Sequence, residues 1–466
     1  MAGRGAFLFW LFLILAVAPS RATAEEPWRL QSALDLPDWL RVSGETRLRY
    51  EALDGQFRAG RTGGDQGFFI RSLLLTEADT GAVTFGVELQ DSRAYLTDSG
   101  TPLTTSLVNP LDVLQAYARV KAPGLLGAGS RTDLILGRQT VNIGSRRQIA
   151  RFGYANVIRN FTGAHAVSKN DRGDELHIVL VSPLGRAPTL RSELDNNVLR
   201  FDREQFGRRV WGLHYRRADI ALLSAPDLWG ELFVYGLNEE DTDRVATPNR
   251  QYVTPGFRLF RKPKAGRWDI DLEGALRLGT RRATSDAGDT QDLKVRASSL
   301  MARAGYTFDA PWRPRVALQY FWASGDEDPD DDRFDQYERL FAARRTDLNH
   351  TGLHGPLTFT NLSAPGVRLD VKPTARTDAR LHYSAAFLAS DTDTFTVSRL
   401  RDASGQSGDF AGHAIDMRAR ARVLPGNLVL EVGASAFVFG EFTKATRADP
   451  RVNRTLYAYL QATASF

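Results

Sequence analysis

Residues 456–466 read LYAYLQATASF, and the chain ends on the phenylalanine of this stretch. When successive side chains alternate, Leu456, Leu460 and Phe466 fall on one face, whereas Tyr457 and Gln461 fall on the other. A period of two is that of a β-strand. A strand whose apolar face meets lipid and whose polar face meets water belongs to a transmembrane β-barrel. The end of the chain therefore predicts an all-β protein that crosses a membrane with strands.

The same alternation recurs along the chain. Between residues 41 and 51, Leu48 and Tyr50 alternate with Arg47 and Arg49. In water such a sheet would need a second layer over its apolar face, but lipid covers that face in a membrane, and closure leaves no unpaired edge. The closing strand with its terminal aromatic residue also resembles the signature read by the barrel assembly machinery of the bacterial outer membrane. Further alternating stretches lie at 268–278, 415–423 and 428–438.

The first 24 residues have the three parts of a secretory signal peptide. Arg4 precedes an apolar run from Ala6 to Ala18, and the small residues Ala22-Thr23-Ala24 form a cleavage site. The run is shorter than the ~20 residues that span a bilayer. We therefore expect residues 1–24 to be removed and the mature protein to begin near Glu25.

The composition agrees with an exported barrel. Cysteine is absent from the 466 residues, so no disulfide can stabilise the fold. The precursor has 60 Lys and Arg against 55 Asp and Glu, a net charge of +5; residues 1–24 hold two arginines and no acid, which leaves +3. Hydrophobic residues make up only 42%, as expected where every second strand residue faces lipid.

Short and long connections alternate between the expected strands, which is typical of outer-membrane barrels. We predict a single-chain antiparallel barrel of about eighteen strands over residues 40–466, preceded by a periplasmic segment, residues 25–39. The short turns would face the periplasm and the long loops the cell exterior. The short turns are at 79–81, 170–174, 262–266, 309–313, 372–378 and 425–427, and the long loops at 97–111, 139–160, 183–206, 238–251, 280–291, 324–362, 390–411 and 440–453.

Arginine is frequent at the strand positions expected to face the interior. A guanidinium group presents a rigid fork of donors that suits carboxylates, and it keeps its charge at any relevant pH. A lumen lined in this way attracts anions. Inward acids such as Glu45 and Asp269 leave the alternative that single arginines form ion pairs within the wall. The inward arginines are Arg47, Arg49, Arg277, Arg315, Arg368, Arg418, Arg420 and Arg422.

Two stretches resemble conserved blocks of the alginate export family. Residues 136–163 read LGRQTVNIGSRRQIARFGYANVIRNFTG, and residues 337–352 read YERLFAARRTDLNHTG. The similarity extends from about residue 40 to the end of the chain. It implies an eighteen-stranded outer-membrane barrel with an electropositive constriction, and the best-known members of the family pass a polyuronate.

By position in the first block, the resemblance assigns Arg138 and Arg159 to the lumen or its constriction. Arg146 and Arg147 lie in the following loop and would reach the lumen if that loop folds inward. Phe161-Thr162-Gly163 departs from the family, which more often has an aspartate before the glycine. One acidic group of the constriction is therefore expected to be missing.

The function we predict is a channel for an anionic polysaccharide or oligosaccharide. The alternative within transport is a substrate-selective porin for small anions or sugar acids. A third reading, an outer-membrane enzyme, would need a nucleophile, base and carboxylate near the outer rim. Ser407, His413 and Asp409 are of suitable type, but no motif joins them, and we predict a protein that is not an enzyme.

We expect no cofactor and no metal. The acidic run 326–332 lacks the spacing of a coordination loop, so a solvated loop is the favoured interpretation. The expected partners are the anionic permeant, outer-membrane lipid and lipopolysaccharide, the barrel assembly machinery and, if a polymer is exported, periplasmic export components. No nucleic-acid partner is expected.

Overall fold

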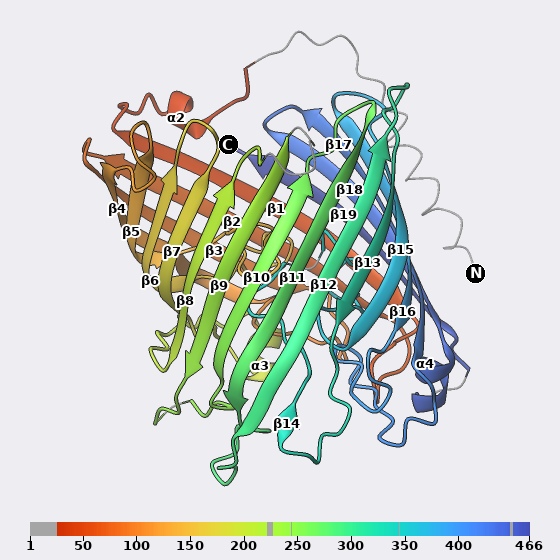
Figure 1. The fold of residues 1–466 in the computed structure, drawn as a ribbon. Helices are drawn as coiled ribbons and strands as arrows, with labels where there is room; N and C mark the ends of the chain where they lie inside the picture. The colour runs from red at the N-terminus through yellow and green to blue at the C-terminus, as the bar shows by residue number, and fades with distance from the viewer. Residues whose placement is uncertain (1–25, 221–226, 244, 344, 448–450) are drawn as a thin grey trace.

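The computed structural model describes residues 26–466 except 221–226, 244, 344 and 448–450. Residues 1–24, the expected signal peptide, lie outside this part of the chain. Figure 1 shows tilted strands that surround a central axis. The strands are β1 (Leu40–Asp54), β2 (Asp65–Asp79), β3 (Val83–Tyr95), β4 (Asn109–Pro123), β5 (Arg131–Gln139), β6 (Phe161–Lys169), β7 (Glu175–Pro183), β8 (Arg208–Arg217), β9 (Leu228–Glu239), β10 (Gln251–Arg261), β11 (Arg267–Arg281), β12 (Leu293–Thr307), β13 (Arg315–Ala323), β14 (Arg333–Phe334), β15 (Leu362–Val371), β16 (Thr377–Phe387), β17 (Phe410–Leu424), β18 (Leu428–Phe439) and β19 (Arg454–Ser465).

The predicted eighteen-stranded antiparallel barrel is confirmed. Each long strand pairs antiparallel with the next, and β1 pairs with β19 from Glu45↔Ser465 to Asp54↔Leu456, which closes the sheet. The two-residue strand β14 is not part of the wall; it lies in the connection between β13 and β15 and pairs parallel with β12. Closure leaves no unpaired strand edge, so the backbone groups that cross the membrane are hydrogen-bonded between strands.

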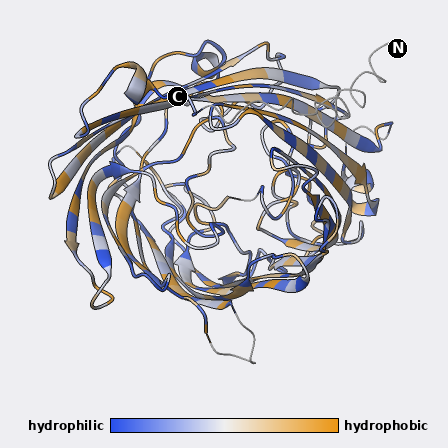
Figure 2. Cartoon of the chain, turned by 90° about the horizontal axis from the view of Figure 1, so that it is seen from above, coloured by the Kyte–Doolittle hydropathy of each residue, from blue (hydrophilic) through white to orange (hydrophobic). Residues whose placement is uncertain are grey.

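The alternation predicted from sequence separates the two faces of the wall. On β19, Leu456 and Leu460 are exposed on the outer face, whereas Tyr457 and Tyr459 are buried inside. Figure 2 shows hydrophobic and hydrophilic residues alternating along the strands. Within the described residues, no helix is long and apolar enough to cross a membrane.

The two ends of the barrel differ, as predicted. The short turns lie at one end together with α2 (Leu30–Ala33) and the C-terminus, and the long loops with α3 (Arg191–Asp195) and α4 (Glu441–Thr446) lie at the other (Figure 1). Three connections were not predicted from sequence: the loop 55–64, which contains the buried Phe57, the short turn 124–130 and the connection between β8 and β9.

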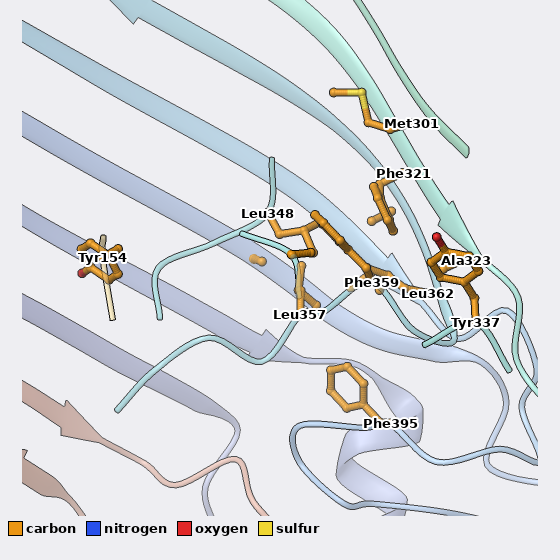
Figure 3. Packing of buried hydrophobic residues seen from close by; sticks show 14 of the residues in the cluster. Tyr154, Met301, Phe321, Ala323, Tyr337, Leu348, Leu357, Phe359, Leu362 and Phe395 are labelled. Atoms are coloured by element: carbon orange, nitrogen blue, oxygen red, sulfur yellow. The ribbon is translucent and has the colours of Figure 1, made fainter. Parts of the chain in front are cut away.

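Loop 140–160 and the later part of loop 324–361, from Tyr337 onward, fold into the barrel, whereas residues 327–332 are exposed at the long-loop end. Loops cross the interior in the view along the axis (Figure 2). Leu348, Leu357 and Phe359 of the second loop pack near Phe321 of β13 in Figure 3, and the rings of Phe321 and Phe359 stack with their centroids 4.6 Å apart. The barrel is therefore partly filled by an apolar core of its own loops.

The N-terminal segment is tied to the last hairpin at the short-turn end. Asn427, in the turn between β17 and β18, accepts a hydrogen bond from the Trp28 backbone N–H at 2.9 Å and donates to the Trp28 carbonyl at 2.7 Å. Its side chain also donates to the Ser465 carbonyl at 2.8 Å. One amide thus joins the N-terminal segment, the last turn and the last strand.

Replacing Asn427 by alanine is expected to destabilise the barrel by about 1–3 kcal/mol, because three hydrogen bonds at the closing strands are lost together. Urea unfolding of the refolded protein, followed by tryptophan fluorescence, measures this loss. Asn196→Ala, which removes an exposed amide at the opposite end, serves as the control and should change the midpoint little.

Candidate functional site

A cavity of about 1110 Å³ forms a vestibule at the long-loop end of the barrel. Its wall is built by loops from around the barrel, among them 55–64, 96–108, 140–160, 184–207 and 324–361. Arginines dominate the charged residues of this wall, and only two aspartates, Asp65 and Asp98, accompany them. The seven arginines are Arg58, Arg61, Arg159, Arg186, Arg191, Arg339 and Arg399.

Most of these arginines lack an acidic partner: in the described part of the chain only Arg191 of the seven forms an ion pair, with Asp195 at 2.8 Å. Arg159, Arg186, Arg339 and the exposed Arg399 also form no side-chain hydrogen bond with a described residue. Arg159 packs instead over the ring of Phe341, with 5.0 Å between the guanidinium carbon and the ring centroid. Arg186 and Arg339 also act on the charge of Arg159, and we call these three residues the unpaired arginines. Their charge is available to an anionic solute.

The unpaired arginines also act on one another. The pKa of Arg159 lies well below its usual value, first because the surrounding protein removes water from it and then because Arg186, Arg339 and Arg208 carry the same charge. The loss of water around a charged group and the repulsion between like charges both cost free energy, and a bound anion reduces both costs. The arrangement therefore favours anion binding in the vestibule.

Beneath the vestibule, the two inward loops pair with each other. Ile149 and Phe341 form an isolated parallel bridge. The Phe341 N–H donates to the Gln148 carbonyl at 2.8 Å, and the Ala150 N–H donates to the Phe341 carbonyl at 3.1 Å. The exposed Arg146 accepts a third such bond at its carbonyl from Ala343, at 2.9 Å. We call the paired segments 143–156 and 338–353 the plug.

Arg147 holds the plug to the wall. It forms ion pairs with Asp271 at 2.7 Å and Glu273 at 2.7 Å on β11, and with Asp347 of the plug at 2.9 Å. These carboxylates hold the pKa of Arg147 well above its usual value against the effect of burial. The loop folds inward, and the donors of Arg147 bind carboxylates of the protein.

Arg47 and Arg49 on β1 also bind the plug. Arg47 donates to the carbonyls of Gly153 and Tyr154 at 2.8 and 2.9 Å, and Arg49 donates to the Tyr154 carbonyl at 2.7 Å. Arg49 also pairs with Glu51 at 2.7 Å, and both side chains are fully buried. Both side chains point inward, and their partners are carbonyls of the plug together with the side chains of Asn156 and Glu51.

Arg277 on β11 also binds one of the two inward loops. It is buried, donates to Thr254 at 3.0 Å and to the carbonyl of Glu338, and lies over the ring of Tyr337 at 4.6 Å. Its partners Tyr337 and Glu338 both belong to the second inward loop. Arg277 therefore anchors that loop from the opposite wall.

Arg138 is paired, in contrast to Arg159. Its guanidinium lies 2.8 Å from Glu204 and 3.5 Å from Asp112. The two arginines that the family resemblance assigned to the constriction thus have different environments. Arg159 lines the vestibule with its charge free, whereas the charge of Arg138 is largely balanced.

A row of inward arginines follows β13, β15, β16 and β17 towards the short-turn end. Asp370 accepts from Arg315, Arg368 and Arg380, at 2.7–3.3 Å. Asp378 accepts from the arginines at 418, 420 and 422, at 2.7–3.4 Å. With Asp269, which also pairs with Arg315, six arginines face three aspartates, so the row keeps a positive excess. Both interpretations of the inward arginines therefore apply to this row: each arginine pairs with an aspartate of the wall, and the row as a whole carries a positive excess. The six are Arg315, Arg368, Arg380, Arg418, Arg420 and Arg422.

Sequence reasoning missed most of the vestibule. Arg186 and Arg339 lie in loops, where strand alternation carries no information about direction. Arg339 does fall inside the second family-like block, in YERLF, and that block was the one available signal. Arg186 follows the end of β7, and no motif or periodicity around it indicates that it lines the vestibule.

The other groups considered from sequence do not assemble. In the described chain, no hydrogen bond joins His413 to Asp409 or Ser407; His413 bonds to the hydroxyl of Tyr383 at 2.9 Å. Most of the acidic run is exposed, except the buried Asp326. Among described residues, no group of three or more His, Cys, Asp or Glu side chains could hold a metal ion.

Loop 184–207 carries a pH-sensitive contact. Asp202 accepts hydrogen bonds from Asn109 at 3.0 Å and from the Ala187 N–H at 2.9 Å, and its own N–H donates to Asp112. Burial and then the Asp112 carboxylate raise the pKa of Asp202 to about 7. The docked loop therefore binds this proton more tightly than a free loop does.

We expect loop 184–207 to dock more firmly below pH 7 and to loosen as the pH rises through 7, because the raised pKa belongs to the docked state. Hydrogen exchange of the loop at about pH 5.5 and pH 8, corrected for the intrinsic rates, measures the difference. Asp202→Asn should remove the pH dependence; an equal dependence in that variant would assign it to another group.

Comparison with known proteins identifies relatives of this chain. The profile of a family described as alginate export matches residues 38–456. No curated protein matches the sequence significantly.

Solved structures share the fold at low sequence identity. OccK9 (OpdG) of Pseudomonas aeruginosa superposes with a TM-score of 0.59 at 15% identity, covering 92% of this chain and 98% of that one. OpdK of the same organism, solved with vanillate, gives 0.57 at 12% identity, with coverage of 92% and 98%. OccK2 (OpdF), solved with glucuronate, gives 0.56 at 11% identity, with coverage of 92% and 96%.

Proposed function

We propose that this member of the alginate export family, which folds as an outer-membrane porin barrel, is a channel that passes sugar acids and short acidic oligosaccharides. The observation that carries this proposal is the vestibule with its three unpaired arginines. Uncompensated guanidinium groups inside a pore raise the local concentration of anions and bind carboxylates with two parallel hydrogen bonds.

The size of the vestibule supports short solutes. A volume of about 1110 Å³ slightly exceeds the roughly 300–1,000 Å³ of pockets that enclose drug-sized ligands. The plug lies directly beneath it and is fixed to the wall by Arg47, Arg49 and Arg147. The glucuronate and vanillate found in two barrels of similar fold are small carboxylates, which is the same class of permeant.

Export of a long anionic polysaccharide is the second candidate, favoured by the family itself. A polymer chain would need the plug to move aside, because it must thread the barrel without interruption. This function would also require periplasmic export components at the short-turn end. Outer-membrane lipid and lipopolysaccharide would surround the barrel in either case.

Planar-bilayer recording of the refolded mature protein tests the proposal. Under a KCl gradient the reversal potential should show anion selectivity, and D-glucuronate or a short oligouronate should block the current transiently. Long oligouronate that blocks the current without crossing would support the passage of short solutes, whereas its passage through the channel would support export of a polysaccharide. Cation selectivity, or none, would overturn both.

A further inference from the structure

Loop 184–207, between β7 and β8, exposes aromatic side chains at the long-loop end of the barrel (Figure 1). Phe201 and Phe206 leave 60% and 61% of their surface exposed, although phenylalanine is among the residues most often buried. The loop itself is tied to the wall: the Asn197 side chain donates to the Ala94 carbonyl at 2.8 Å and accepts from the Ala94 N–H at 2.9 Å. The two rings are therefore exposed on a loop that is held in place.

Two arginines accompany these rings. Asp202 is buried against the wall, so its neighbours Phe201 and Arg203 point to the other side of this extended segment, and both are exposed. The Nε of the exposed Arg209 donates to the Phe206 carbonyl at 3.3 Å, which places the second arginine beside the second ring. Aromatic and cationic groups thus alternate along residues 201–209.

Arg209 lies at the upper end of the lipid-facing side of β8. Trp211 and Leu213 follow it at intervals of two residues on the same face, and Leu213 is exposed there. Trp211 lies opposite Leu180 of β7, which is also exposed on the outer face. The apolar outer face therefore ends at Arg209, where a barrel passes from lipid chains to headgroups.

Both arginines have charge to offer to a ligand. Arg203 forms no ion pair within the described chain, since the adjacent Glu204 is bound to Arg138 at 2.8 Å. Arg209 pairs with Glu240 at 3.2 Å, but both side chains are more than half exposed, and pairs of this kind contribute little. A guanidinium group is well suited to phosphate, which it binds with two parallel hydrogen bonds.

Phe201, Arg203, Phe206, Arg209 and Trp211 form what we call the outer-rim face. The long loops of outer-membrane barrels lie on the cell exterior, where the membrane leaflet consists of lipopolysaccharide, and its lipid A anchor joins phosphate groups to acyl chains.

We propose that the outer-rim face is a specific binding site for one lipid A molecule, with its phosphate groups on Arg203 and Arg209 and its acyl chains along Phe206 and Trp211. Two observations select this occupant: the charge of the arginines is complementary to phosphate, and the face continues the lipid-facing surface of β7 and β8. The site lies on the outside of the barrel and does not depend on which solute passes through the channel.

Native mass spectrometry of the refolded mature protein in detergent tests the site with three probes: diphosphoryl lipid A, monophosphoryl lipid A and phosphatidylglycerol. Diphosphoryl lipid A should bind one-to-one and more tightly than the other two, because only it offers a phosphate group to each arginine. Replacing Arg203 and Arg209 together by glutamine should weaken its binding about tenfold, because charge-assisted hydrogen bonds are lost.

Arg296→Gln is the matched control for this double variant. Arg296 is an exposed arginine of β12 that lies opposite the exposed Leu278, so it shares the lipid-facing side but is remote from loop 184–207. This variant should bind lipid A as the parent protein does. Equal losses in both variants, or equal binding of lipid A and phosphatidylglycerol, would mean that only a general coat of lipid surrounds the barrel, and the proposal would fail.

A further variant, Phe206→Ser, distinguishes a lipid site from a contact between two copies of the chain. It should weaken the binding of lipid A and leave the elution volume in size-exclusion chromatography unchanged. Elution at a smaller size with undiminished lipid A binding would make the face a subunit interface and overturn the proposal. Heat-modifiable migration in gels verifies that each variant is folded, and anion selectivity in KCl should persist in all of them, which separates this site from the channel function.

Discussion

Replacing Arg159, Arg186 and Arg339 together by glutamine is expected to abolish most of the anion selectivity of the channel. A unit charge about 4 Å from a permeating ion in water is worth ~1 kcal/mol, or roughly fivefold in local concentration. Removing three charges that lack carboxylate partners should therefore lower the positive potential of the vestibule strongly. The chloride-to-potassium permeability ratio should fall several-fold, as measured by the reversal potential under a KCl gradient.

The environment of each arginine sets the controls for this experiment. Arg200→Gln removes an equal charge from the same loop as Arg186, but Arg200 is exposed and pairs with Glu193 at 2.8 Å, so selectivity should change little. Arg138→Gln should have an intermediate, smaller effect than Arg159→Gln, because Glu204 and Asp112 already balance Arg138. Equal effects of all variants would mean that total charge, and not the vestibule, sets selectivity.

Salt concentration gives an independent check on the same set of variants. The Debye length is about 10 Å at 0.1 M salt and about 3 Å at 1 M, so exposed charges are screened progressively. The difference between parent and triple variant should be largest in dilute KCl and shrink towards 1 M. A difference that did not depend on salt would indicate a change of pore shape instead of a loss of fixed charge.

The strands of the wall could be predicted from sequence because the alternation of side chains that defines them is a local pattern. Arg47, Arg49 and Arg277 alternate with lipid-facing residues, and a period of two fixes which face each occupies. Their chemical role could not be read in the same way. The structure shows them bound to the plug, and the carbonyls of Tyr154 and Glu338 that they hold are more than 60 residues distant in sequence.

The vestibule was harder to predict because its residues come from loops. A loop has no periodicity, so nothing in the residues around Arg186 says that it meets Arg159 and Arg339. Arg159 was found through a family-like block and not through its spacing.

Replacing Arg147 by methionine is expected to release the plug and increase single-channel conductance. After the substitution, the guanidinium group nearest to Glu273 is that of Arg258, at 3.8 Å. Asp271 keeps its ion pair with Arg258 at 2.7 Å, and Asp347 keeps its ion pair with Arg303 at 2.8 Å. Removing one partner of a buried ion pair costs about 3–5 kcal/mol. Most of this cost falls on the state in which the plug is docked, because undocking lets water reach the stranded Glu273.

Single-channel recording and urea unfolding together measure the outcome. The variant should show larger and noisier currents, with the barrel still folded. Arg282→Met, which breaks the more exposed pair with Asp241 at 3.0 Å, is the matched control and should leave conductance as it is. Glu273→Gln added to Arg147→Met removes the stranded carboxylate and should restore part of the stability and of the original conductance.

The double variant also decides what holds the plug. If Arg147→Met opens the channel and Glu273→Gln closes it again, the buried charges control the docking, and the plug is an element that a change in charge can move. If Arg147→Met destabilises the protein but conductance stays the same, the bonds from Arg47, Arg49 and Arg277 to carbonyls of the plug suffice to keep it in place. In that case long polymers could not pass, and the short-solute function would gain further support.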